Sequence, residues 1–330
     1  MRPATRLLRR PTAAVAAVIA VAAVIVFTLA TDGLWLSQQN MAEVLRVTAV
    51  LGVIAAGEAI VITVGEIDIS VGSTFGIVGI TYLGLIPMLG LVPAVLIALL
   101  VAAGIGLING WVVTRFAIPS LIVTLGMLFV LRGVAYTAAN PPKSATRDVR
   151  AEPLLQLLGG GELGDYSVAL VWALAVGLVL QYLLFWTPLG NRLLAVGGNA
   201  QSARSRGVHV SRVKLGAFVT CALLAGFAGV IEASHLGYAD GAFGRQRELP
   251  AIAAAVLGGC ALAGGRSSIV GTFLGAFILS AIASFLVIQH MPPQWYMLLL
   301  GLIIIVVSLA DRSLLILSQR LLSQRSIRSA

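Results

Sequence analysis

The sequence predicts an all-α, polytopic membrane protein with about ten transmembrane helices. Of its 330 residues, 59% are hydrophobic and only 11% are charged, and the mean hydropathy is +1.00. A soluble domain carries about 25% charged residues, so this chain has too few charges to cover a surface in water. Its apolar residues also form long runs, each close to the roughly 20 residues that one spanning helix needs. Together these observations exclude a soluble enzyme, a secreted disulfide scaffold and a disordered chain.

Ten apolar runs follow one another along a single transmembrane domain, 1–330. The first run, Ala13 to Ala30, exceeds the apolar region of about 7–15 residues in a signal peptide, so we expect an uncleaved span. Glycines interrupt the chain near 65–73 and 250–266, which predicts broken or short helices there. Such breaks are tolerated at membrane depth only inside protein or beside a water-filled cavity. The other nine runs lie at 45–64, 70–90, 93–114, 118–138, 168–187, 214–232, 250–263, 268–288 and 295–310.

Basic residues cluster in the short segments between these runs. With both termini in the cytoplasm, the inner segments hold fifteen of the 22 basic residues and the outer segments hold six. This asymmetry follows the positive-inside rule and predicts an N-in, C-in topology. The cytoplasmic segments are then the tail 1–12, the loop 187–214 and the tail 311–330. The distribution also argues against nucleic acid as the partner of this chain, whose formal net charge is +9.

Two connecting segments carry local signals of their own. The external loop 139–167 contains proline and glycine breakers and predicts one short helix near 153–158. The C-terminal tail 311–330 alternates leucines and arginines, which is typical either of a short amphipathic helix at the inner leaflet or of a frayed end.

Four polar residues within or beside the spans are candidates for a solute path or gate: Glu58, Asp68, Ser70 and Asn109. An ionised carboxylate at the bilayer centre costs about 2.5–3.5 kcal/mol, so Glu58 should face the protein interior, water or a partner such as Arg132. It can equally be a structural group that holds helices together. For Asp68 and Ser70, capping of the following helix is the simpler interpretation. Asn109 suits a hydrogen bond between helices or to a hydroxylated ligand.

The cytoplasmic loop 187–214 contains a helix with clear boundaries. Asn199 is a good N-cap, residues 200–206 suit a helix of about two turns, and Gly207 is a natural stop. The loop holds basic residues and no acidic ones, as a positive-inside anchor would. An anchor does not require a capped helix with small residues on one side, whereas a short helix inserted into a partner's groove does.

Catalytic and metal chemistry find little support in the sequence. Cys221 and Cys260 lack metal-ligand spacing, and the three histidines are widely separated without acidic neighbours at ligand spacing. An intramembrane enzyme would need a nucleophile with its base or a metal cluster. A phosphate-binding loop needs Gly-Lys-[Ser/Thr], and neither Lys143 nor Lys214 follows a glycine. An ATP motor must therefore be a separate chain.

Three stretches, in this order, resemble the membrane permease subunits of bacterial ABC importers for monosaccharides and autoinducer-2. The segment 65–73 is similar to the family's Gly-Gly-Ile-Asp-Leu-Ser-Val-Gly-Ser motif, 195–214 to its coupling loop, and 248–272 to its C-terminal motif. In the first and third stretches the matching residues are Gly65, Ile67, Gly72, Glu248, Gly258, Gly259, Gly264 and Gly265. In the coupling loop, the resemblance implies contact with an ATPase through Gly197, Gly198, Asn199, Ala203, Arg204 and Gly207.

The resemblance implies the permease subunit of an ATP-driven importer in the bacterial inner membrane, working by alternating access on a small sugar or sugar-like solute. It implies a cytoplasmic ATP-binding subunit, a second permease chain (identical or paralogous) and an extracytoplasmic sugar-binding protein, with membrane lipid around the spans. ATP and magnesium would bind the ATPase, and no cofactor would bind this chain. Two departures stand out, because Glu66 occupies a position that is usually glycine and Cys260 lies where hydroxylated residues are common.

One alternative function remains open from the residues alone. An ion-coupled secondary transporter would use Glu58 or Asp68 as its proton site, and it would need no ATPase. The sequence does not identify the solute.

Overall fold

A computed structural model describes residues 11–145 and 151–309. Apart from Pro11 and Thr12, the two predicted cytoplasmic tails lie outside these described residues. Eight helices are long and apolar enough to cross a membrane. They are α2 (Pro11–Ala30), α3 (Gln38–Thr63), α4 (Val71–Leu89), α5 (Leu91–Phe116), α6 (Ser120–Ala138), α9 (Ala169–Trp186), α12 (Val210–Leu236) and α14 (Ile269–Ile288). The all-α polytopic class is thereby confirmed.

Two shorter apolar helices account for the remaining predicted runs, namely α13 (Glu248–Leu257) and the helix Gln294–Leu309. The ten residues of α13 rise about 15 Å at 1.5 Å per residue, half of the roughly 30 Å hydrocarbon core. The eighth run is therefore too short to cross the membrane by itself.

Both predicted breaks are confirmed. Helix α3 ends at Thr63, and α4 begins only at Val71. After α13 the chain passes through turns at 258–268 before α14 begins at Ile269. Each break leaves polar backbone groups to be paired inside the protein.

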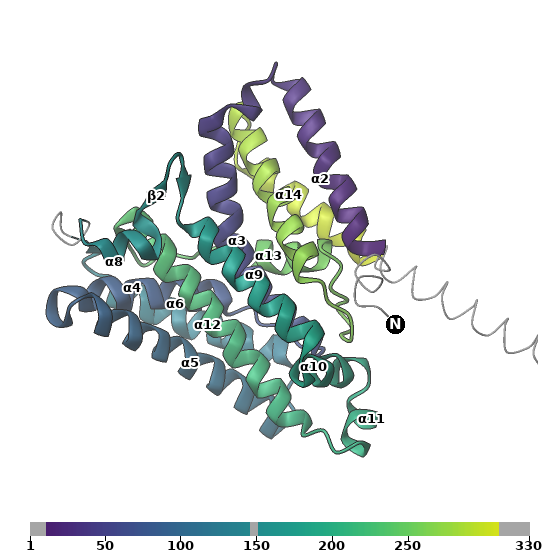
Figure 1. Ribbon diagram of the computed structural model, residues 1–330. Coiled ribbons are helices and arrows are strands. Elements are labelled where there is room, and N and C mark those ends of the chain that lie inside the picture. Colours follow the sequence, from purple (N-terminus) through teal and green to yellow (C-terminus); the bar gives the residue numbers. More distant parts are fainter. Residues whose placement is uncertain (1–10, 146–150, 310–330) are drawn as a thin grey trace, which may run out of the picture.

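The connections contain short elements. The predicted helix near 153–158 forms as α8 (Pro153–Leu155) and η2 (Gln156–Gly160), and η1 (Leu34–Leu36) follows α2. Strand β1 (Lys143–Ser144) pairs antiparallel with β4 (Tyr238–Ala239), and β2 (Glu162–Leu163) pairs antiparallel with β3 (Tyr166–Ser167). In Figure 1, β2 lies at the end of the bundle opposite to α10 (Pro188–Gly198) and α11 (Ala200–Ser205).

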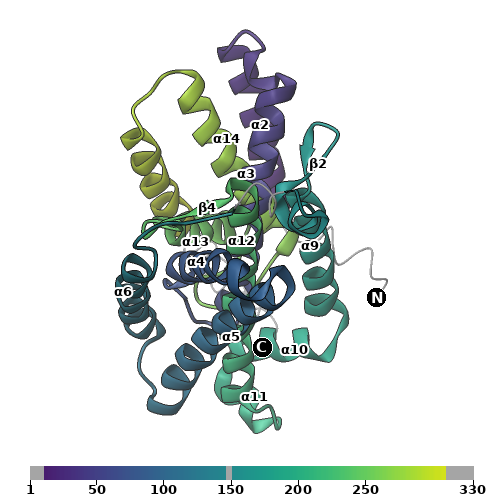
Figure 2. The ribbon, with the colours of Figure 1, turned by 90° about the vertical axis from the view of Figure 1, so that its left-hand side faces the viewer.

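Helices α3, α4 and α12 form the centre of the bundle, and most of their length is buried, whereas α2, α6 and α9 face outward. In Figure 1, α5 and α12 run side by side, and Figure 2 places α2 and α14 above them. The outward helices expose large apolar side chains such as Leu29 and Leu174. Such a surface suits lipid or a neighbouring membrane chain.

Glycines let these helices approach closely. A Cβ on Gly106 of α5 would lie 2.6 Å from Phe218 O, and a Cβ on Gly275 of α14 would lie 2.2 Å from Ala254 O. Neither distance leaves room for a methyl group, so α5 packs on α12, and α14 on α13, through bare backbone. Small residues serve this purpose at helix interfaces in membranes.

Candidate functional site

The loop between α9 and α12 forms two short helices at one end of the molecule, as Figures 1 and 2 both show. Thr187 caps α10, which the sequence did not predict, and Asn199 caps α11 by accepting a hydrogen bond from Ser202 N at 2.9 Å. Gly207 ends α11 at a φ of 82°. The predicted N-cap, helix and stop of α11 are therefore all present.

The C-terminus of α11 forms a Schellman motif. Gly207 N donates to Arg204 O at 2.9 Å, and Val208 N donates to Ala203 O at 3.1 Å. The same pattern ends α3, where Gly65 N bonds Ile62 O at 3.0 Å and Glu66 N bonds Val61 O at 3.2 Å. Both motifs need a residue at positive φ, which glycine adopts without a Cβ penalty. Gly259 is the residue with positive φ at the end of α13, where φ is 98°.

Five glycines from three distant segments meet backbone to backbone beside α11, and we call them the glycine junction: Gly65, Gly197, Gly198, Gly264 and Gly265. A Cβ on Gly197 would lie 1.8 Å from Thr63 O and 2.5 Å from Gly265 N. A Cβ on Gly264 would lie 2.9 Å from Gly197 O and 2.9 Å from Gly65 N. Gly265 N also donates to Thr63 O at 3.0 Å. The three stretches that carry the family resemblance thus touch one another.

Side-chain hydrogen bonds fasten the turn at 64–70 to α6. Ile67 N donates to Ser120 Oγ at 3.2 Å, and Ile69 N donates to Thr124 Oγ1 at 3.1 Å. These bonds pair backbone groups that the break leaves without helical partners. The two bonds therefore hold the turn against α6.

Glu66 and Lys214 form an ion pair between this turn and the first part of α12. A pocket of about 320 Å³ lies against the pair, and its wall includes the α5–α6 connection and Arg204 of α11. This partner for Glu66 was not predicted, because 148 positions separate the two residues.

The four candidate path residues lie together inside the chain. Asp68 accepts hydrogen bonds from Ser70 N at 2.9 Å and from Asn109 Nδ2 at 3.3 Å, and Asn109 Nδ2 also donates to Ser70 Oγ at 2.9 Å. The Cys221 thiol lies 3.9 Å from Glu58 Oε1, and Glu58 lies beside Asp68. All four polar residues are at most 1% exposed. In this conformation they connect α3, the turn, α5 and α12, and they face no open space.

Two expectations about this cluster need correction. Arg132 does not pair with Glu58, because its guanidinium donates to Phe243 O at 3.5 Å. Ser70 occupies the N-cap position of α4 without a side-chain capping bond, because its hydroxyl bonds Asp68 instead. Burial raises the pKa of the Asp68 carboxyl, and the hydrogen bonds from Ser70 and Asn109 oppose that rise.

The residues of the C-terminal stretch are also internal contacts. A Cβ on Gly72 would lie 2.2 Å from Glu248 Oε2, and a Cβ on Gly258 would lie 2.3 Å from Gly271 C. Cys260 is 2% exposed, and its sulfur lies 3.5 Å from Ser267 Oγ and 3.6 Å from Thr272 Oγ1. The departure at Cys260 therefore faces the chain's own interior.

The predicted coupling residues divide into two groups. Asn199 and Arg204 are exposed at the end of the molecule. Ala203 is only 4% exposed and packs into the core, while Gly197 contacts the glycine junction. The neighbours of Ala203 and Gly197 belong to this chain, and contact of these two residues with an ATPase stays a prediction.

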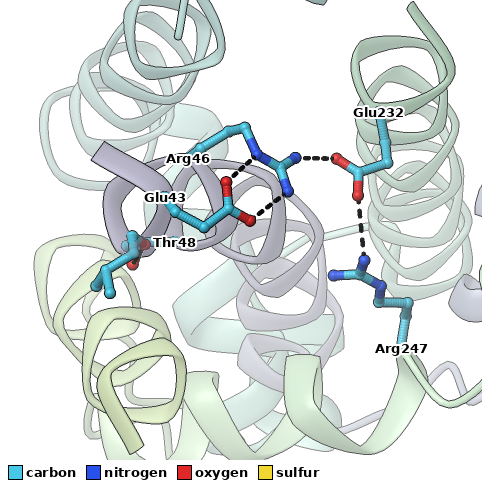
Figure 3. Close-up of polar contacts among 6 residues, drawn as sticks. Glu43, Arg46, Thr48, Glu232 and Arg247 are labelled. Carbon is cyan, nitrogen blue, oxygen red and sulfur yellow. Dashed lines mark hydrogen bonds and ion pairs between the residues drawn. The ribbon is translucent and has the colours of Figure 1, made fainter. Parts of the chain in front are cut away.

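Four charged residues in the other half of the bundle form a second polar site, which we call the outer ion cluster: Glu43, Arg46, Glu232 and Arg247 (Figure 3). The Arg46 guanidinium lies 2.7 Å from both Glu43 Oε1 and Glu232 Oε2, and Arg247 reaches Glu232 Oε1 at 3.3 Å. Arg247 also lies 5.8 Å from the Phe75 ring centroid. The cluster joins α3, α12 and the residue before α13. The partner that Arg46 and Arg247 share, Glu232, was not predicted from the sequence.

Among the residues that the structure describes, no group of three or more His, Cys, Asp and Glu side chains is placed to hold a metal ion.

Comparison with known proteins identifies relatives over most of the chain. The ribose import permease protein RbsC of Escherichia coli (strain K12) is 34% identical over 275 residues, covering 82% of this chain and 85% of the relative. The xylose transport system permease protein XylH of the same strain is 31% identical over 350 aligned positions, covering 88% of each. The autoinducer 2 import system permease protein LsrC of Yersinia pseudotuberculosis is 33% identical over 283 residues, covering 85% of this chain and 79% of the relative. No solved structure matches the chain significantly.

The family model described as "Branched-chain amino acid transport system / permease component" matches residues 40–308. This range includes the glycine junction, α11 and the outer ion cluster. The family match supports a transport role and gives no support to the ion-coupled alternative. The chain belongs to this permease family and is a multi-pass membrane transport subunit, not an enzyme.

Proposed function

We propose that this chain forms the translocation pathway of an ATP-driven importer for a small sugar or sugar-like solute. The names of the relatives support this solute class, since they refer to ribose, xylose and autoinducer 2. The chain also lacks a phosphate-binding loop of its own. ATP and magnesium then bind a separate cytoplasmic subunit.

One observation carries the coupling part of the proposal, namely that the exposed helix α11 follows directly from the glycine junction. A helix that only anchored positive charge needs no rigid support beneath it. Here the end of α10 contacts α3 and the 258–268 loop through bare backbone, so a push on α11 reaches the centre of the bundle. This arrangement suits a helix that receives force from an ATPase.

The remaining partners belong to the same proposal. A second permease chain, identical or paralogous, would complete the pathway, and the exposed apolar helices α2, α5, α6 and α9 offer surface for it and for lipid. A sugar-binding protein would deliver the solute at the end that carries β2 and β3. The proposed cytoplasmic side is the end that carries α11, in agreement with the basic residues there.

The experiment is a detergent pull-down of the tagged chain from the bacterium that carries it, with ATPase activity assayed on the co-purifying proteins. Arg204→Glu should reduce the recovered nucleotide-binding subunit by about tenfold, because the exposed guanidinium lies on α11. Arg192→Glu applies the same charge change on α10 and serves as the matched control. Recovery of the ATPase at wild-type levels with Arg204→Glu would contradict the assigned surface.

A second measurement tests the class of solute that the chain transports. A deletion strain complemented with the wild-type chain should regain ATP-dependent uptake of one labelled monosaccharide from a panel that includes ribose and xylose. Uptake that persists when ATP is depleted but collapses with the proton gradient would contradict the proposal.

A further inference from the structure

We propose that the Glu66–Lys214 ion pair is a positioning contact that makes the turn at 64–70 follow the movement of α11 and α12. This inference rests on the proposed coupling function and adds residues to it. It concerns the one departure from the family motif, at position 66, that places a new charge beside the glycine junction.

The local backbone directs Glu66 toward α12. Gly65 is the left-handed residue of the Schellman motif that ends α3, and Glu66 is the next residue, with its N–H bonded to Val61 O. An apolar side chain commonly occupies this position and packs back on its own helix. Here the side chain is a carboxylate, and it pairs instead with a different helix. The side chains of Glu66 and Lys214 are 12% and 23% exposed, so solvent screens the pair only in part.

Neither charge is stabilised by the end of the helix nearest to it in the chain. A helix C-terminus carries partial negative charge, which disfavours an acidic residue just after α3. Lys214 is the fifth residue of α12, and the end of the helix nearest to it carries partial positive charge, which offers a cation no stabilisation. Neither residue is therefore stabilised by the dipole of the adjacent helix, and each compensates the charge of the other. A pair of this kind gains its stability only while the two helix ends stay together.

The ion pair links the turn at 64–70 to α12, which the glycine contacts do not do. Bare-backbone contacts at Gly197 and Gly264 resist approach, because atoms cannot overlap. The Gly265 N–Thr63 O hydrogen bond does resist separation, but it joins the 258–268 loop to α3 and does not involve α12. An ion pair resists separation, so the turn can be pulled by α12 as well as pushed by α10.

The turn then passes this movement to the rest of the bundle. Ile67 and Ile69 are bonded to Ser120 and Thr124 of α6, and Asp68 is bonded to Asn109 of α5. Arg204 of α11 lines the same pocket as Glu66 and Lys214. The chain of contacts thus runs from α11 and α12 through Glu66 to α5 and α6.

The test is ATP-dependent hydrogen exchange on the assembled complex in lipid nanodiscs, followed at α11 and at residues 64–70. In the wild type, ATP should change exchange in both segments. Glu66→Lys and Lys214→Glu should each reduce the change at 64–70 by about fivefold or more and leave the change at α11 in place. The double swap Glu66→Lys with Lys214→Glu should restore the change at 64–70.

A milder variant and a control distinguish loss of the ion pair from misfolding of the variant protein. Glu66→Gln removes only the charge and should give the same selective loss, while co-purification with the ATPase is retained. Arg115→Glu reverses an exposed charge at the end of α5 and should leave both changes intact. If single variants keep the ATP-induced change at 64–70, or the double swap does not restore it, the inference is wrong. If ATP has no effect at α11 in the wild type, the proposed function fails as well.

Discussion

At the α11 end, distant segments touch through glycine backbone, whereas in the outer half α3, α12 and the start of α13 are joined by charged side chains. In the glycine junction the geometry is fixed by the chain itself, since a Cβ on Gly197 would lie 1.8 Å from a carbonyl oxygen. In the outer ion cluster, long side chains of Arg46 and Arg247 share one carboxylate, that of Glu232. The first contact tolerates almost no displacement, and the second can re-form at several separations.

This difference suits the two ends to different tasks. A segment that receives force has to transmit a small displacement, and close-packed backbone does this because it is hardly compressible. A segment that opens has to break contacts and make them again, and ion pairs between flexible side chains permit that. The comparison predicts that substitutions that change only a few atoms will alter the stability of the protein by different amounts at the two ends.

The largest effect is expected for Gly197→Ala. The added methyl group meets Thr63 O and Gly265 N, so overpacking should destabilise the protein by about 3 kcal/mol and abolish coupled transport. Gly198→Ala is the matched control, because a Cβ there meets no atom within 4 Å. The thermal unfolding midpoint in detergent, recorded at a fixed scan rate, measures the stability of both variants. Equal midpoints for the two variants would show that the backbone contact is not as close as described.

A smaller effect is expected for Glu232→Gln in the outer ion cluster. The carboxylate is 6% exposed and compensates two guanidinium groups, so its loss should cost roughly 2–3 kcal/mol. Glu43→Gln is the comparison, because that side chain is 57% exposed and its loss should cost less than about 1 kcal/mol. The same unfolding assay applies. A larger loss for Glu43→Gln than for Glu232→Gln would contradict the assigned order.

The smallest effect is expected for Asn199→Ala, which removes the N-cap of α11. One lost capping bond should weaken that helix by about 1 kcal/mol and leave the bundle intact. Faster hydrogen exchange at residues 200–207, with no change in the long helices, is the expected result. Asn191→Ala on α10 removes a side chain of the same kind that is not an N-cap. Unchanged exchange at α11 would show that another contact holds the helix.

The sequence predicted the local parts of this picture well. Asn199 and Gly207 mark the ends of α11 because capping acts over three or four residues, a spacing that is visible in the chain itself. The breaks near 65–73 and 250–266 were likewise visible as glycines within apolar runs.

Long-range pairs could not be predicted in the same way. Arg46 and Glu232 are 186 positions apart, and nothing in one sequence distinguishes Glu232 from another acidic residue as the partner of Arg46. The same limit explains why Arg132 was named as a partner for Glu58. Glu58, Asp68, Ser70 and Asn109 were each selected for their polarity in an apolar setting, and only the fold brings them together.

The most direct test of the account is photo-crosslinking from single positions in the complex purified from its native membrane. A crosslinking amino acid at Gln201, exposed on α11, should capture the nucleotide-binding subunit. The same amino acid at Tyr166, which is 40% exposed at the opposite end, should not capture it. Capture from Tyr166 and not from Gln201 would contradict both the coupling role of α11 and the predicted orientation of the chain.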